Sequence, residues 1–480
     1  MLVEKAAETI YAVLAIPGIV FLVGFIYARP QEFFEQLRTI PLLYVYFALA
    51  LFGAALDIRL RNLRIRSTPL LPWVALLFGW SVLTVVIRNP SGALAPILGL
   101  SICVSLYLLI AHGVQTFRAL HIVAGAVLAM VIFICFVGAH QGFTPTGCVV
   151  VDPSTQGETT AGRPDGRPCD SIRACYLGEV EPGAEYACEH IGLLGTTSVG
   201  GGRVRYRGVL QDPNELALAG GVGLPLAFAF SESRKKTLGR RLVAVLTLAL
   251  VLLCAVLTGS RGGQIVVLTV LAAYGFKRFG VKGLVLGAAL AAPLLLLGGR
   301  SGEEASSSTL ERLDCWASAL SMWRSHPLLG VGLGQFTEHN YMTAHNSYLL
   351  ALSELGLPGM IIFSIIVYLS AKIPFAVLRD MGNAAVEDGG ALAGGSVARP
   401  WAMGLIAAFA GLTVGIFFLS FTYHYVLWIY IGLSGALYSA VRAHCQSFKV
   451  RFGLADLAVV LTIDVAAIVL VHAYTGSALA

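Results

Sequence analysis

Long apolar runs, separated by short polar segments, follow one another along most of the chain. About thirteen of them approach the roughly 20 residues that an α-helix needs to cross a bilayer core. They cover residues 9–27, 40–56, 69–87, 93–111, 119–139, 214–231, 242–258, 263–276, 280–298, 357–376, 401–420, 424–441 and 455–475. Because unpaired backbone groups are costly in lipid and no segment alternates as a barrel strand does, the pattern predicts separate membrane-spanning helices. Three ionisable residues in the last run, Asp456, Asp464 and His472, leave open whether that run spans the membrane or lies on it.

Composition supports the same class of protein. Hydrophobic residues make up 57% of the 480 residues, charged residues only 12%, and the mean hydropathy is +0.78. A soluble domain carries roughly a quarter charged residues. We therefore expect an all-α, polytopic membrane protein with about 12–13 transmembrane helices. The short polar start, Met1–Glu8, is followed by a run long enough to span, which predicts a retained first helix and not a cleaved signal peptide.

Lysine and arginine are distributed asymmetrically between the loops. The basic segments 59–66, 233–241, 277–282 and 441–451 all fall on one side if the chain alternates from an N-terminus on the cytoplasmic side. Two long polar segments then lie on the outer face. The predicted organisation is N-terminal helices at 1–139, a cysteine-containing loop at 140–213, central helices at 214–298, a second outer loop at 299–356, and C-terminal helices at 357–480.

The first long loop holds four cysteines, Cys148, Cys169, Cys175 and Cys188, in a Gly-, Pro- and Asp-rich stretch. An even number of cysteines in such a segment favours two disulfides and an oxidising compartment outside the cytoplasm. Zinc binding is the alternative, because His190 follows Cys188 closely, but no Cys-x-x-Cys pair is present. The three possible pairings stay open.

Three arginines beside the outer loops are candidates for binding an anion. Arg207 lies in RYRGVLQDPNELALAGG, Arg261 in the turn TGSRGG, and Arg312 at the start of an amphipathic stretch that includes two tryptophans. A guanidinium is always charged and fits phosphate oxygens through two parallel hydrogen bonds. The alternative for each is a structural role, either reaching to the membrane interface or pairing with an acid such as Asp212 or Glu311.

His345 and Asn346, in TAHNSYLLALSELGLPG, stand where a polar loop meets an apolar run. We expect a helix that begins with these two residues and breaks near Gly356. In that case His345 and Gly356 share one helix face. The positive end of the helix dipole keeps the imidazole neutral, which suits it to act as a base. Asn346 would orient the ring or a substrate hydroxyl. The alternative is a histidine that only caps the helix.

Taken together, these motifs resemble the O-antigen ligase and polymerase family. His345-Asn346, followed by nine residues and Gly356, looks like the His-[Asn/Ser/Gln]-x9-Gly motif of ligases. The segments YARPQEF (27–33), RGVLQDPNELA (207–217), TGSRGG (258–263) and RSHPLLGVGLGQF (324–336) are similar to other landmarks of the family, so the resemblance covers about 27–440.

The resemblance implies an inverting glycosyltransferase of the bacterial inner membrane with its active site on the periplasmic side and no metal or other cofactor. His345 would act as general base, while Arg207 and Arg261 would hold the diphosphate. The donor would be a glycan on undecaprenyl diphosphate, and the acceptor either lipid A-core, for a ligase, or another lipid-linked glycan, for a polymerase. The His-Asn motif slightly favours the ligase. Membrane lipids are the other expected partner, and no nucleic acid is expected.

Two features depart from the family pattern, namely the cysteine-containing insertion and a run beyond the usual twelve spans. Arg203 and Arg205 also compete with Arg207 for its role. Two other mechanisms stay open. Glu32 and Glu35 can form a carboxylate–metal glycosyltransferase site. A transporter would instead place its ionisable residues near the middle of the membrane.

Overall fold

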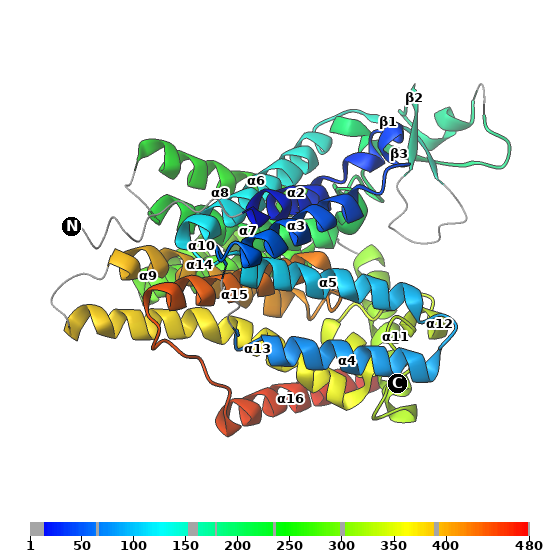
Figure 1. Cartoon of the computed structure of the whole chain (residues 1–480). Coiled ribbons are helices and arrows are strands. Elements are labelled where there is room, and N and C mark those ends of the chain that lie inside the picture. Colours follow the sequence, from blue (N-terminus) through cyan, green and yellow to red (C-terminus); the bar gives the residue numbers. More distant parts are fainter. Residues whose placement is uncertain are drawn as a thin grey trace.

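The computed structural model describes residues 14–63, 67–151, 162–177, 180–233, 237–297, 303–387 and 393–478. The chain forms a bundle of roughly parallel and antiparallel helices with a small sheet at one end (Figure 1). Met1–Glu8 and the start of the first apolar run lie outside the described residues.

Each of the apolar runs coincides with part of a helix. The long helices are α2 (Ala15–Ala28), α3 (Leu42–Arg59), α4 (Leu71–Arg88), α5 (Leu94–Gly113), α6 (Phe117–Gln141), α7 (Pro213–Glu232), α8 (Leu238–Leu257), α9 (Arg261–Phe279), α10 (Val281–Leu297), α11 (Glu303–Ser325), α13 (Ser347–Glu387), α14 (Ala393–Gly415), α15 (Tyr425–His444) and α16 (Leu454–Ala478). Ten helices of the described residues are long and apolar enough to cross a membrane, and α16 is one of them. The all-α polytopic class is confirmed.

The two ends of the bundle differ in the segments that they carry. At the end with the sheet, which we call the sheet end, Arg88 donates through Nε to the carbonyl of Gly330 at 2.9 Å. At the opposite end, Arg278 of α9 bonds Glu232 of α7 at 3.2 Å, and Lys372 of α13 donates to the carbonyl of Arg451 at 3.0 Å. The basic segments thus gather opposite the sheet, and the two long polar segments share the sheet end, as the alternation of loops predicts (Figure 1).

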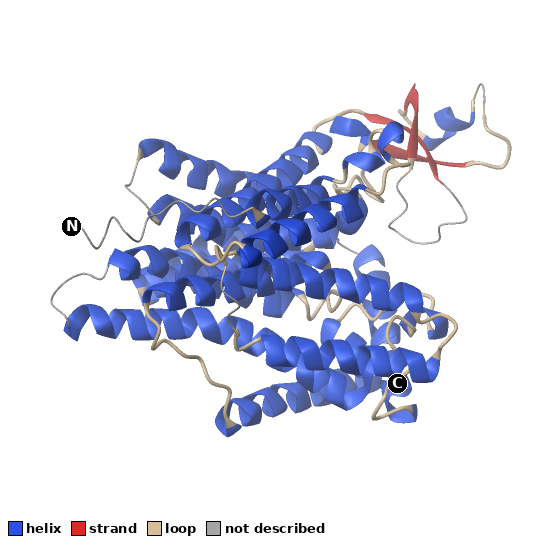
Figure 2. Cartoon of the chain, in the orientation of Figure 1, coloured by secondary structure: helices blue, strands red, loops and turns tan. Residues whose placement is uncertain are grey.

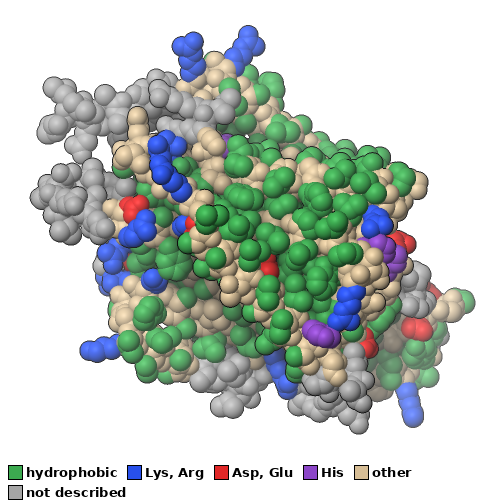
Figure 3. Space-filling view, turned by 90° about the horizontal axis from the view of Figure 1, so that it is seen from below, with side chains coloured by type: hydrophobic (Ala, Val, Ile, Leu, Met, Phe, Trp, Pro, Cys, Tyr) green, Lys and Arg blue, Asp and Glu red, His purple; other side chains and the backbone are tan. Residues whose placement is uncertain are grey.

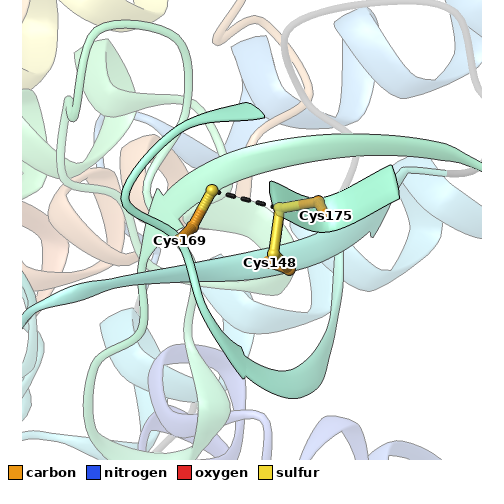
Figure 4. Close-up of side chains that lie close together, drawn as sticks. All are labelled: Cys148, Cys169 and Cys175. Carbon is orange, nitrogen blue, oxygen red and sulfur yellow. Dashed lines mark hydrogen bonds between the residues drawn. A yellow bond between two sulfur atoms is a disulfide. The ribbon is translucent and has the colours of Figure 1, made fainter. Parts of the chain in front are cut away.

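The first long segment folds into a small antiparallel sheet that projects from the bundle (Figure 2). Its strands are β1 (Thr146–Val151), β2 (Arg163–Pro168) and β3 (Glu185–His190), in the order β2-β1-β3. Disulfides join Cys148 to Cys175 and Cys169 to Cys188, with Cα–Cα distances of 5.5 and 5.6 Å (Figure 4 shows the first bridge). The prediction of two bridges is confirmed, and because all four sulfurs are bonded, none of them is a thiolate that could bind zinc.

The helices are buried to very different degrees. In the apolar part of α15, 89% of the residues are buried inside the protein, against only 17% in the apolar part of α16. The face seen in Figure 3 is covered by hydrophobic side chains, with charged groups towards its two ends, as expected of a surface in contact with lipid. The structure therefore has α15 at its centre and α16 at its periphery.

A break in α13 shapes the sheet end. Gly356 has φ 70°, and a Cβ added there would lie 2.1 Å from the carbonyl oxygen of Leu328. The amide of Leu357 donates to the carbonyl of Pro327 at 2.9 Å, and the indole of Trp80 donates to the carbonyl of Leu355 at 2.8 Å. These bonds satisfy backbone groups that the break exposes, which is required in an apolar environment. The break lets the glycine-rich turn after α11 lie directly against α13.

Candidate active site at the sheet end

The start of α9 joins the start of α7. Ser260 caps α9 by accepting a hydrogen bond from the amide of Gly263 at 3.0 Å, and its hydroxyl donates to Oδ1 of Asn214 at 2.6 Å. Arg261 is the exposed first residue of α9, and no acid occupies the first turn. A cation at the positive end of a helix dipole is locally unfavourable. An anion bound there would interact favourably with both the helix N-terminus and the guanidinium.

The arginines at 203, 205 and 207 point to different places. Arg203 is buried and donates through Nε to the carbonyl of Thr258 at 3.0 Å, in the turn just before α9. Arg205 is also buried and donates to the carbonyl of Thr197 at 3.0 Å. Arg203 therefore contacts the turn leading to Arg261.

Arg207 lies towards the N-terminal helices. Its guanidinium donates to the carbonyl of Glu32 at 3.0 Å, bonds the carbonyl of Gly195, and stacks over the ring of Phe33 at 5.3 Å. Partial burial lowers the pKa of this guanidinium, while the nearby Glu32 carboxylate acts in the opposite direction. Two of its nitrogens bind backbone carbonyls, so Arg207 has a structural role in joining two loops whether or not it also binds a ligand.

A small cavity of about 10 Å³ lies between the start of α9 and Arg312 of α11. We call it the arginine cavity. It is lined by Asn214, Leu218, Gly262, Gly263, Val266, Arg312, Gly415, Phe418 and Leu419. Arg312 lines this cavity, and Arg261 directly precedes the lining Gly262 in the sequence, whereas Arg207 is not among the lining residues.

The segment that carries His345 is fixed to a wall of the same cavity. Thr343 donates to the hydroxyl of Ser420 at 2.9 Å, and Ser347 donates to the carbonyl of Leu419 at 2.6 Å. The amide of Ser347 also donates to the carbonyl of Ile416 at 2.8 Å. His345, half-buried, lies between two residues that bind 416–420, and this stretch includes the cavity-lining Phe418 and Leu419. The fold therefore holds the segment that contains His345 against the wall of the arginine cavity.

The expected helix start at His345-Asn346 is wrong by two residues. The helix begins at Ser347, and Asn346 is its cap, accepting from the amides of Tyr348 at 2.9 Å and Leu349 at 3.1 Å. His345 precedes the cap in a left-handed conformation with φ 47°. The argument that His345 and Gly356 share a helix face fails, because one residue lies before the helix and the other breaks it. The preference of Asn for the cap position was the signal for this arrangement.

Glu354 is a buried residue whose role the sequence reasoning missed. Its Oε1 accepts from the amide of Phe336 at 3.0 Å, and its carbonyl accepts from the amide of Gly332 at 2.9 Å. It thereby holds the glycine-rich turn against α13, close to the break. An acid inside an otherwise apolar helix is the signal that could have identified it.

The carboxylate–metal alternative finds little geometric support at Glu32. Its side chain pairs with Arg29 at 3.4 Å, and its carbonyl is bound by Arg207. Nothing is described of the side chain of Glu35. The polar candidates His345, Arg261 and Arg312 instead gather at one end of the bundle, which is also not the arrangement of a transport site near the middle of the membrane.

Fold and site together describe a polytopic membrane protein with a small cavity lined by Arg312 at one end and with the segment of His345 bound to its wall. Residues 246–364 match the family model described as O-Antigen ligase, and this match includes Arg261, Arg312, His345 and Gly356. This part of the chain is thus similar to the O-antigen ligase family, whose members are glycosyltransferases of the ligase and polymerase type, and the resemblance drawn from its motifs is confirmed there. No curated protein matches the chain.

Proposed function

We propose that this protein transfers a glycan from undecaprenyl diphosphate to an acceptor hydroxyl at the periplasmic face of the bacterial inner membrane. The observation that carries the proposal is the convergence of two features. The start of α9 and Arg312 line one cavity, and the segment of His345 is hydrogen-bonded to the wall of that cavity. The proposed location is supported by the disulfides, which favour an oxidising compartment at the sheet end, and by the basic segments at the opposite end.

In the proposed reaction His345 removes the proton from the acceptor hydroxyl. The hydroxyl oxygen then attacks the anomeric carbon of the donor sugar from the side opposite the diphosphate. A new C–O bond forms, the C–O bond to the diphosphate breaks with inversion, and undecaprenyl diphosphate leaves with the bonding electrons. The abstracted proton stays on His345 until it passes to solvent. General base catalysis of this kind typically contributes about 10²–10⁴-fold.

The negative charge that develops on the leaving diphosphate calls for fixed positive groups. Arg261, Arg312 and the first amides of α9 supply them in the proposed site, and such preorganised stabilisation is usually the largest catalytic contribution. These groups need no metal ion for that role. Arg207 remains a proposed second diphosphate ligand, acting from the loop that it joins to Glu32 and Gly195.

We favour a ligase, whose acceptor is lipid A-core, over a polymerase, whose acceptor is another lipid-linked glycan. The support is the His-Asn-x9-Gly pattern of residues 345–356. Both activities need the same donor site, so His345 and the arginines do not separate them. The difference lies in the acceptor that reaches His345.

The glycan phenotype of a deletion strain tests this proposal. We expect polymerised glycan to accumulate on the lipid carrier, with none on lipid A-core. Expression of the native chain should restore transfer to lipid A-core, and expression of His345→Ala should not. Core capped by a single repeat, or loss of a secreted polysaccharide, would assign the polymerase instead. Unchanged envelope glycans in the deletion strain would contradict both.

A further inference from the structure

A pocket with several polar groups lies between the end of α2 and the start of α3, at the sheet end. Its volume is about 150 Å³, and its lining includes Arg29, Gln31, Tyr44 and Tyr425 among aliphatic side chains. A single buried water occupies about 10–15 Å³ of a cavity. This pocket, which we call the α2–α3 pocket, therefore has room for a ligand group much larger than a water, such as one sugar ring.

The backbone holds Arg29 of this pocket in a fixed position. Arg29 ends α2 in a left-handed conformation with φ 46°, and its amide donates to the carbonyl of Phe25 at 3.0 Å. Its side chain lies against the backbone of Gly208, where an added Cβ would be 2.8 Å from it. Residues other than glycine adopt this conformation only where the surrounding structure imposes it. The guanidinium is thus oriented before any ligand binds.

The charges around Arg29 favour an anionic ligand. Its Nη1 lies 3.4 Å from Oε1 of Glu32, which is longer than the roughly 2.7–2.9 Å of a strong charge-assisted hydrogen bond. Arg207 donates to the carbonyl of the same Glu32. One carboxylate thus lies between two guanidiniums and leaves a net positive charge. An oxyanion in the pocket can form the short bonds to Arg29 that Glu32 does not form.

The other polar groups of the pocket suit a ligand that also carries hydroxyls. Gln31 lines the pocket, and its buried Oε1 has no hydrogen-bond partner within the part of the chain that the structure describes. A buried acceptor without a partner is costly, so a ligand hydroxyl that donates to it would bind favourably. Phe25, Tyr44 and Tyr425 add aromatic surface, and the two tyrosines add hydroxyls. Together these groups fit a sugar ring that carries a carboxylate or a phosphate.

The segment 416–425 connects this pocket to the segment of His345. Tyr425 lines the pocket, while Thr422 donates to the carbonyl of Ser347 at 2.8 Å and the amide of Phe421 donates to the hydroxyl of Ser347 at 2.7 Å. Ser347 follows His345 by two residues. The pocket and the segment of the proposed base are therefore both fixed to one short stretch of chain.

Two side chains at the rim of the pocket belong to the apolar outer surface. Ile40 is 45% exposed and Tyr44 is 59% exposed, and both line the pocket at the start of a membrane-spanning helix. The pocket thus borders the surface that faces the lipid. A glycan anchored in the membrane by its own lipid can reach it from the side.

We propose that the α2–α3 pocket binds an anionic sugar of the acceptor glycan, with the carboxylate or phosphate on Arg29 and a hydroxyl on Gln31. This inference rests on the proposed function and gives the acceptor a site of its own. The diphosphate of the donor is assigned to other groups, at Arg312 and the start of α9. A phospholipid head group also carries a phosphate, and the experiments below separate it from the acceptor.

A comparison of acceptor charge with arginine charge tests the pocket in the full-length protein. The acceptors are lipid A-core and a neutral form of it, with phosphates removed and carboxylates reduced to alcohols. Arg29→Gln removes the charge from the pocket. Arg38→Gln is the matched control, because Arg38 is an exposed arginine of the same α2–α3 connection that does not line the pocket.

The native protein should have a KM for lipid A-core about tenfold or more below its KM for the neutral form, as expected of one charge-assisted hydrogen bond. Arg29→Gln should lose this preference, and Arg38→Gln should keep it. The KM for the donor, and kcat at saturating acceptor, should stay unchanged in both variants, whereas a general structural defect would lower kcat.

A preference for the charged acceptor that persists in Arg29→Gln, or that Arg38→Gln loses equally, would overturn the assignment of the pocket. Native transfer in that same experiment would still uphold the proposed function. Native protein that transfers to neither acceptor would overturn the function itself.

Photocrosslinking gives a second measurement that needs no transfer. A benzoylphenylalanine in place of Tyr44 keeps an aromatic ring at the rim of the pocket. In vesicles that contain anionic phospholipid and lipid A-core but no donor, it should crosslink to lipid A-core, and added Arg29→Gln should reduce the yield. Crosslinks to phospholipid alone, or a yield that Arg29→Gln does not change, would contradict the proposal.

Discussion

Arg261 and Arg207 carry the same guanidinium in different surroundings. Arg261 is exposed at the positive end of α9 and directly precedes Gly262 of the arginine cavity, whereas Arg207 is half-buried with its nitrogens on the carbonyls of Glu32 and Gly195. Sequence alone pointed to both, because motifs report residue types near a turn. It does not report which of several neighbouring arginines faces the turn, and here Arg203 contacts it.

Replacing each arginine by lysine should separate these roles. Arg261→Lys keeps the charge but loses the planar pair of donors that matches a diphosphate. We expect kcat/KM to fall about 10²-fold, as for the loss of a donor to developing negative charge. Arg207→Lys should lower kcat/KM less than Arg261→Lys does, and should also lower the midpoint of thermal unfolding, because two bonds to backbone carbonyls are lost. Kinetics and melting curves of both purified variants provide the measurement. If Arg207→Lys is stable and loses more kcat/KM than Arg261→Lys, Arg207 is the main ligand of the diphosphate.

At the scale of elements, the break in α13 and the glycine-rich turn fit against each other. Gly330 has φ 64°, and a Cβ there would lie 2.4 Å from the backbone of Glu354, just as a Cβ on Gly356 would meet Leu328. Because α13 begins beside His345 and breaks at Gly356, its first turns are held between the glycine-rich turn and the 416–422 segment. The position of His345 therefore depends on both elements.

Gly356→Ala should damage the sheet end, because the left-handed backbone alone costs about 1–3 kcal/mol and the added methyl meets the Leu328 carbonyl. We expect a lower unfolding temperature in detergent and a lower rate of transfer. Gly99→Ala, in α5, is the matched control, since nothing lies within 4 Å of its added Cβ and alanine favours a helix. Equal behaviour of the two variants would show that the break does not position the site.

Most of the helices could be predicted from the sequence, but some contacts between segments could not. The apolar runs identified the helices, because a segment of about twenty consecutive apolar residues crosses a membrane as an α-helix. The run at 214–231 likewise identified α7, where Asp212 forms a capping box with Glu215. The contact of 343–347 with 416–422 could not be foreseen, since the partners are far apart in sequence and both look like loops. His345, with its left-handed φ of 47°, lies within that stretch.

At the scale of the whole molecule, the two ends of the bundle have different chemistry. The sheet end carries both disulfides, the arginine cavity and His345, while the opposite end carries the basic segments. The charges of the loops predicted this division correctly. Because each span takes the chain to the other end of the bundle, the position of one loop determines the positions of all the others. The small sheet was not predicted, since its strands are short and rich in Gly, Pro and Asp.

Reporter fusions should assign the two ends to the two sides of the membrane. Fusions at Arg64, Lys235 and Lys277 should report the cytoplasm, and fusions at Pro164 and Ser307 the periplasm, because positively charged loops are retained inside. Measuring alkaline phosphatase and green fluorescent protein activity at each site makes the two readouts complementary. A cytoplasmic signal at Pro164 would contradict both the argument from the disulfides and the proposed periplasmic location of the site.

Transfer by the purified protein, reconstituted in lipid vesicles with a glycan on undecaprenyl diphosphate and lipid A-core as acceptor, tests the central claim most directly. The native protein should form the glycosylated acceptor and release undecaprenyl diphosphate in the presence of a metal chelator. His345→Ala should still bind the donor but lose about 10²–10⁴-fold in rate, because a base acts after binding. Full transfer by His345→Ala, or native transfer that stops when chelator is added, would contradict the account.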